Sequence, residues 1–154
     1  MQDVLQAALS VEHEVVYGYG VVGAWTSNHA QDIAYEALQG HQLRRDALAG
    51  RIEALGAVPT PAAVGYTLPY RVDSALAAAR LGAALEDAAA RAMWALVAAS
   101  RPAGSIRRDA VRWLAQSADW LSSWRWASGV FTAEVLPGQP ADSQPSTTPT
   151  SSPS

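Results

Sequence analysis

The chain has 154 residues, enough for one domain with a full core, and its composition is 49% hydrophobic and rich in alanine, which favours helices. The formal net charge of −3 argues against a nucleic-acid-binding protein, because such proteins carry clustered cations. The absence of cysteine excludes disulfides, thiolate metal sites and thiol nucleophiles.

Residues 2–26 form the first predicted helix, because apolar side chains recur there at helical spacing. At about 100° per residue, Glu12 falls near the centre of the apolar face, whereas Glu14 falls on the opposite side. A buried carboxylate is costly unless another group neutralises it. Glu12 is therefore the first candidate site residue.

A second helix is predicted over residues 30–55, after a turn at 27–29 that is too short for anything but an antiparallel pair. His41 is central on its apolar face, Arg45 lies one turn further on, and Arg44 sits at the margin. An imidazole and a guanidinium on an apolar face match the misplaced carboxylate of the first helix. We therefore expect Glu12, His41 and Arg45 to meet.

Residues 56–72 form the one long internal connection, which contains three prolines. Gly56 is expected to end the second helix, and Asp73 or Ser74 to cap the next one. Extended, this segment could cross about 50 Å, whereas a helix of about 25 residues is only about 38 Å long. The third helix can therefore start parallel to the second.

The third predicted helix covers residues 74–100 and places Glu86 within its inward arc. The fourth covers residues 106–133, with Trp113, Trp120 and Trp124 facing inward and Asp119 on the polar face. From residue 137 onward the sequence is rich in Pro, Ser and Thr and lacks apolar anchors, which is typical of disorder. We predict one helical domain over residues 1–136 and a disordered tail over 137–154.

Four helices of similar length with a long middle connection predict an all-α, ferritin-like four-helix bundle with a crossover between the second and third helices. Five short segments carry a further resemblance, which covers roughly residues 5–131: Glu12-His13…Tyr17, His41-Gln-Leu-Arg-Arg-Asp46, Tyr66…Leu68-Pro69, Leu85-Glu86 and Trp124-Arg125. The chain thereby resembles a family of small bacterial ferritin-like domains of unknown function. The resemblance implies the fold and brings no established activity.

A ferritin-like di-iron site takes a glutamate from each of two helices and a Glu-x-x-His pair from each of the other two. Glu12, His41 and Glu86 are each expected near mid-helix on an inner face. The pattern then fails, because Leu38 stands three residues before His41 and the fourth helix has no histidine. Two carboxylates and one imidazole do not make the usual ligand set for two irons.

Three interpretations of this cluster follow. In the first, which we favour, Glu12, His41, Arg45 and Glu86 form a buried, self-neutralising network without a cofactor, in which the arginine stands where a metal would. In the second, Glu12, His41 and Glu86 bind iron or another divalent metal, as in a di-iron oxidase or an iron-handling protein. In the third, the cluster holds a small ligand.

The first interpretation predicts a non-catalytic binding or interaction protein with a degenerate di-iron site, and the second leaves an enzyme open. Trp25 and Trp126 lie off the apolar faces of their helices, which makes them candidates for a homodimer interface. The N-terminus has no cationic region and no apolar run approaches a membrane span of about 20 residues. We expect a cytoplasmic protein that binds neither nucleic acid nor membrane.

Overall fold

A computed structural model describes residues 1–129 of the chain, and these residues fold into an all-helical bundle. Its four helices are α1 (Gln2–Ala24), α2 (Asn28–Ala54), α3 (Ala75–Ala99) and α4 (Ser105–Ser128). The predicted four-helix fold is confirmed, and the observed helix boundaries are close to the predicted ones. The predicted tail at 137–154 and the predicted helical residues 130–133 lie outside the described residues.

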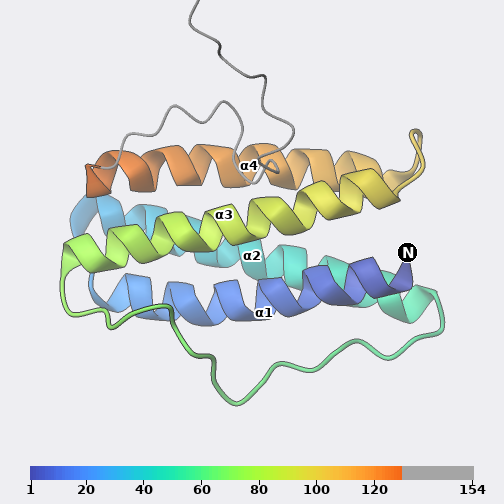
Figure 1. Cartoon of the computed structure of the whole chain (residues 1–154), viewed down its shortest axis with the longest axis horizontal. Coiled ribbons are helices and arrows are strands. Elements are labelled where there is room, and N and C mark those ends of the chain that lie inside the picture. The colour runs from blue at the N-terminus through green and yellow to red at the C-terminus, as the bar shows by residue number, and fades with distance from the viewer. Residues whose placement is uncertain (130–154) are drawn as a thin grey trace, which may run out of the picture.

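The helices run in alternating directions except across the long crossover (Figure 1). Helix α2 returns antiparallel to α1, and the crossover then travels the length of the bundle beside α1, so that α3 starts at the same end as α2. Helix α4 returns antiparallel to α3. The predicted parallel arrangement of the second and third helices is therefore confirmed, and the topology is consistent with a ferritin-like bundle.

The crossover is tied to α1 by side-chain hydrogen bonds. Gly56 ends α2 with a φ of 75°, a value that glycine adopts without strain. The Gln6 amide donates to the Val58 carbonyl at 2.7 Å and its oxygen accepts from the Thr60 amide at 2.9 Å. His13 Nε2 lies 3.0 Å from the Thr60 carbonyl oxygen, so this histidine fastens the crossover rather than joining the buried cluster.

Two apolar clusters fill the bundle, one toward each end, with the buried polar residues between them. Leucine, valine and isoleucine side chains that are fully removed from water each contribute about 1.5–3 kcal/mol, which offsets the cost of the polar centre. One cluster consists of Val15, Tyr19, Val22, Ala34, Ala37, Ala78, Ala79, Leu81, Leu85, Ala89 and Trp124. The other consists of Leu5, Ala8, Leu9, Leu48, Ile52, Met93, Leu96, Val97, Ala110 and Trp113.

Glycine allows α3 and α4 to approach closely where Trp124 packs. A Cβ atom added to Gly82 would stand 2.7–2.9 Å from three atoms of the fully buried Trp124 ring. Because rigid ring atoms and not a flexible chain end occupy that space, an alanine there must push the helices apart. Gly50 of α2, in contrast, is exposed and would meet nothing within 4 Å.

These two glycines give a matched pair of stability predictions. We expect Gly82→Ala to lower the free energy of unfolding by about 1–3 kcal/mol through overpacking. Gly50→Ala should raise it by about 0.5–1 kcal/mol, because alanine loses less backbone entropy in a helix. Urea unfolding of both variants measures the difference, and a stabilised Gly82→Ala protein would contradict the close packing.

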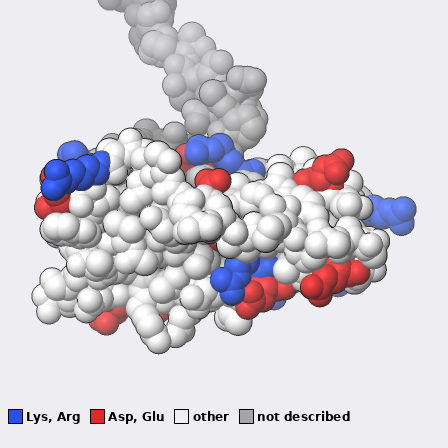
Figure 2. All heavy atoms as spheres, turned by 90° about the horizontal axis from the view of Figure 1, so that it is seen from below, with Lys and Arg blue, Asp and Glu red and all other residues white. Residues whose placement is uncertain are grey.

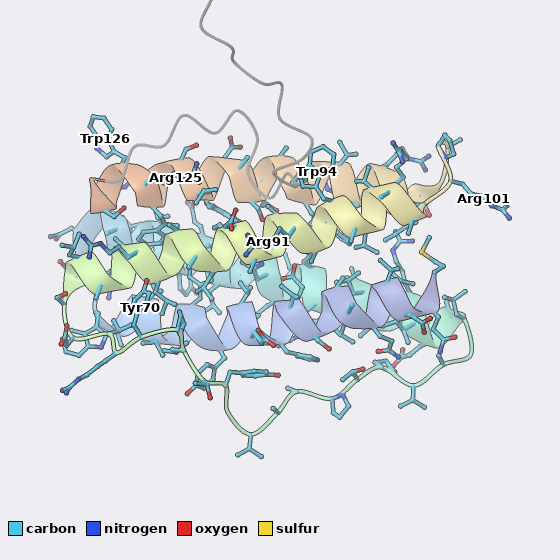
Figure 3. The ribbon with its side chains drawn as sticks, in the orientation of Figure 1. Tyr70, Arg91, Trp94, Arg101, Arg125 and Trp126 are labelled. Carbon is cyan, nitrogen blue, oxygen red and sulfur yellow. The ribbon has the colours of Figure 1, made fainter. Side chains whose placement is uncertain are left out.

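The surface carries mixed charge and two exposed tryptophans. The face seen in Figure 2 shows arginines and acidic residues interspersed with uncharged surface, without one large patch of a single sign. Trp25 is 45% exposed and Trp126 is 77% exposed, and Trp126 points away from the bundle (Figure 3). Within residues 1–129, no helix combines the length and the apolar character that a membrane span needs.

Candidate functional site: a buried ion-pair network

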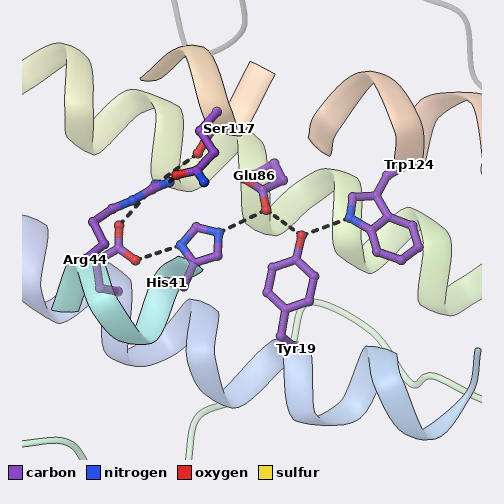
Figure 4. A network of polar contacts seen from close by, with 8 residues as sticks. Tyr19, His41, Arg44, Glu86, Ser117 and Trp124 are labelled. Carbon is purple, nitrogen blue, oxygen red and sulfur yellow. Dashed lines mark hydrogen bonds and ion pairs between the residues drawn. The ribbon is translucent and has the colours of Figure 1, made fainter. Parts of the chain in front are cut away.

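All four helices contribute a fully buried polar side chain to the centre of the bundle (Figure 4). Glu12 comes from α1, His41 and Arg44 from α2, Glu86 from α3 and Ser117 from α4, and each is 0% exposed. Each helix buries one stripe of its surface, and these residues fall on the buried stripes near mid-helix. The burial of so many polar groups is costly unless most of them pair with one another.

His41 lies between the two glutamates and joins them. Its Nδ1 is 2.7 Å from Glu12 Oε2, and its Nε2 is 3.0 Å from Glu86 Oε1. An ionised carboxylate can only accept hydrogen bonds, so two carboxylates in these places call for a donor on each ring nitrogen. The geometry therefore favours the doubly protonated imidazolium form of His41.

The electrostatic balance around His41 supports the same protonation state. Burial by itself would lower the pKa of His41, but attraction to Glu12 and then Glu86, together with the hydrogen bonds to both carboxylates, outweighs burial and raises it. With His41 protonated, its charge and that of Arg44 balance the two glutamates. The network is then neutral as a whole, which limits the cost of burying it.

Tyr19 and Trp124 extend the network beyond Glu86. The Tyr19 hydroxyl donates a hydrogen bond to Glu86 Oε1 and accepts one from Trp124 Nε1 at 2.8 Å (Figure 4). Burial, and next the negative charge of Glu86, raise the pKa of Tyr19 well above its ordinary value, so the hydroxyl keeps its proton and acts as a donor. The Tyr19 ring also stacks on the His41 ring, with 5.5 Å between centroids.

Arg44 closes the network on the side of α4. Its Nη1 lies 3.5 Å from Glu12 Oε1 and donates to Ser117 Oγ at 3.0 Å, while its Nη2 donates to Gln116 Oε1 at 3.1 Å. The guanidinium carbon lies 6.0 Å from the ring centroid of Trp113 and 5.9 Å from that of Trp120, distances at which cation–π attraction contributes. Arg44 is thus held by ion pairing, hydrogen bonds and aromatic rings together.

The prediction that Arg45 is the buried cation is wrong, because Arg44 holds that position. The Arg45 side chain is 31% exposed and pairs with Asp46, whose side chain is 64% exposed. On a helical wheel the two arginines lie roughly 40–60° to either side of Leu48, so the apolar stripe alone does not choose between them. The partners on α4, Ser117 and Gln116, decide in favour of Arg44.

The residues of this cluster differ from the ligand set of a ferritin-type di-iron centre. In the doubly protonated form that its two carboxylate partners favour, His41 has no nitrogen lone pair to offer a metal. Leu38 stands three residues before His41, where the Glu-x-x-His pattern has its glutamate, and the residues of α4 that approach the cluster include Ser117 and Trp120. In the part of the chain that the structure describes, no group of three or more histidine, cysteine, aspartate or glutamate side chains could hold a metal ion.

The raised pKa of His41 predicts that the protein loses stability as the pH rises. The contribution of the proton is complete below the pKa of an unfolded histidine, about 6.5, and is lost as the pH rises through the higher folded pKa. The loss should be about 1.4 kcal/mol for each unit by which folding raises the pKa. Urea unfolding from mildly acidic to alkaline pH measures it.

His41→Gln and His13→Gln provide the matched controls for this titration. The loss of stability with rising pH should disappear in His41→Gln and persist in His13→Gln. The reason is that His13 bonds to the crossover and not to the carboxylates of the buried network. A wild-type stability that rises over the same pH range would contradict the assignment of the proton to His41.

Fold and site together define a small four-helix bundle with a charged network in its core. Comparison with known proteins shows the family to which the chain belongs. A family model described as "Domain of unknown function (DUF4439)" matches residues 4–141, and the chain therefore belongs to this family. It is similar to a solved structure of a conserved hypothetical protein, rv2844, from Mycobacterium tuberculosis, at 36% sequence identity and a TM-score of 0.77, over 80% of this chain and 93% of that one. No curated protein matches the chain.

Proposed function

We propose that this protein is a non-catalytic binding or interaction protein of the ferritin-like superfamily, in which an ion-pair network has taken the place of a di-iron site. The observation that carries the proposal is the position of His41, whose two ring nitrogens each face a carboxylate. Arg44 places a fixed positive charge beside Glu12. This charge would repel a divalent cation bound at the same carboxylate. The topology, with a long crossover after α2, supports the superfamily assignment.

The alternative is a metal-binding ferritin-like protein that uses Glu12, His41 and Glu86 for iron oxidation or iron handling. One observation favours it: Glu86 Oε2 is buried and has no hydrogen-bond partner within residues 1–129, which is what an absent cation would leave behind. A second observation opposes this alternative: the other oxygen of the same carboxylate, Glu86 Oε1, already accepts hydrogen bonds from both His41 and Tyr19.

Metal analysis of the purified chain separates the two functions. After expression in iron-rich medium, we expect well under one metal ion per chain for wild type, Glu12→Ala and Glu86→Ala alike. A stoichiometric metal in wild type that both variants lose would establish the alternative. Asp119→Ala is the matched control, because Asp119 is an exposed carboxylate of α4 outside the network.

The expectations for partners and location belong to the same proposal. Helices α1 and α4 end at the same end of the bundle (Figure 1), so the exposed Trp25 and Trp126 both belong to that end and remain candidates for contact between two copies of the chain. A cytoplasmic location without nucleic-acid binding remains a prediction.

A further inference from the structure

A cleft between α2 and α4 lies directly outside Arg44. Its volume is about 510 Å³, within the usual range for pockets that hold small molecules. Ala47 of α2 and Ala115 of α4 leave it wide because their side chains are small, and Leu43 and Trp113 give it apolar walls. Gly40 also lines the cleft, but the Trp120 ring fills the space that a side chain would take there. Arg44 and Gln116 supply polar groups at the boundary between the cleft and the buried network.

Arg44 lines this cleft, and one edge of its guanidinium group, formed by Nε and Nη2, is not fully hydrogen-bonded. Arg44 Nη2 donates to Gln116 Oε1, but Arg44 Nε is buried and has no hydrogen-bond partner within residues 1–129. In a planar guanidinium, Nε–H and Nη2 lie on one edge, which matches the two oxygens of a carboxylate. The single oxygen of Gln116 therefore occupies half of a site suited to a carboxylate.

The walls of the cleft favour a ligand with an apolar body. Arg112 lines the cleft with a 70% exposed side chain that pairs with Asp109, and Asp119 lines it as well, so these groups add no net positive charge and the recognition of an acid falls to Arg44. An apolar ligand body would lie against Trp113 and Leu43. Gln116 is only partly buried, so its side chain can turn outward and release the edge of Arg44.

We infer that the α2–α4 cleft binds a small organic acid, whose carboxylate displaces the Gln116 amide and accepts hydrogen bonds from Nε and Nη2 of Arg44. This inference rests on the proposed function, since it gives the binding protein a ligand class. Arg44 would then bond to Glu12 and Ser117 of the buried network through Nη1, and to the ligand through the opposite edge of its guanidinium group. Charge assistance makes such a bidentate pair stronger than bonds to a neutral acceptor.

The test uses two probes of equal size, 3-phenylpropionate and its neutral amide 3-phenylpropionamide, titrated into the full chain labelled with ¹⁵N at its tryptophan indoles. We expect the acid to bind about tenfold more tightly than the amide and to shift the Trp113 resonance. Gln116→Ala should bind the acid more tightly because the competing amide is gone. Ala115→Trp should abolish binding by filling the cleft, whereas Ala127→Trp, at an exposed position of α4 that does not line the cleft, should not.

Absence of binding at millimolar acid would overturn the inference. So would equal affinity for acid and amide, or unchanged binding by Ala115→Trp. Metal analysis of the same preparation keeps the two proposals apart. A metal-free protein that ignores the acid refutes only the ligand site, and a metal-loaded protein that binds the acid in the cleft refutes only the absence of a metal centre.

Discussion

Replacing Arg44 with alanine should lower the free energy of unfolding by about 3–5 kcal/mol, because it removes one partner of a buried ion pair and leaves the other uncompensated. Glu12 would keep only His41 as a counter-charge, and Ser117 would lose a hydrogen-bond donor. The variant also leaves a cavity between Trp113 and Trp120. Such a loss is a large part of the stability of an ordinary domain, about 5–15 kcal/mol. Chemical denaturation followed by tryptophan fluorescence measures it.

Arg45→Ala is the matched control for Arg44→Ala, because it removes the same side chain one residue further along the helix. Arg45 pairs with Asp46 at the surface, and exposed pairs contribute at most about 1 kcal/mol. We expect a small change in the unfolding midpoint for Arg45→Ala and a large one for Arg44→Ala. Equal effects in the two variants, or a larger effect at Arg45, would show that the buried cation has been misassigned.

Replacing Glu86 with leucine should have an effect of similar size, about 3–5 kcal/mol, since it removes a buried negative charge that faces two donors. The Tyr19 hydroxyl would lose its acceptor, and the network would keep a net positive charge when His41 is protonated. The pKa of His41 should fall in this variant, because the second carboxylate that raises it is gone. Thermal unfolding at neutral pH and NMR titration of His41 check the two effects separately.

A double variant tests whether Glu86 acts through His41. If the two side chains form one charged unit, Glu86→Leu combined with His41→Leu should destabilise by clearly less than the sum of the single changes. The reason is that removing both partners leaves no unpaired charge, whereas each single change leaves one. Strict additivity would argue that the two residues contribute independently.

The fold followed from the sequence because each helix is long enough for its apolar stripe to be unambiguous. The long segment after Gly56 also showed that the third helix could start beside the second, since its extended length exceeds that of a helix. These inferences depend only on periodicity and chain length. Both can be read from one sequence without knowledge of which helices touch.

The site was only partly predictable, because its polar residues were visible but their partners were not. Glu12, His41 and Glu86 stood out as polar groups on apolar faces, and the structure brings them together. Whether Arg44 or Arg45 is buried depends on which side of α2 packs against α4. A helical wheel of α2 alone does not contain that information. The weak signal was Ser117, a small polar residue on the inner face of α4 that calls for a partner.

Tyr19 was missed for a different reason. Its ring belongs to the apolar stripe of α1, so the sequence assigned it to packing, and its hydroxyl finds Glu86 and Trp124 only through the arrangement of α3 and α4. That arrangement depends in turn on Gly82, which lets the Trp124 ring approach α3. A contact that requires three helices at a defined spacing cannot be derived from the periodicity of any one of them.

The ring nitrogens of His41 offer the most direct measurement, by ¹⁵N NMR of the full chain near neutral pH. If the imidazolium bridges Glu12 and Glu86, both nitrogens carry protons, their chemical shifts are those of the charged ring, and added divalent metal leaves them unchanged. A His41 ring with one unprotonated nitrogen that shifts when iron or zinc is added would contradict this account, because that nitrogen would then be available as a metal ligand.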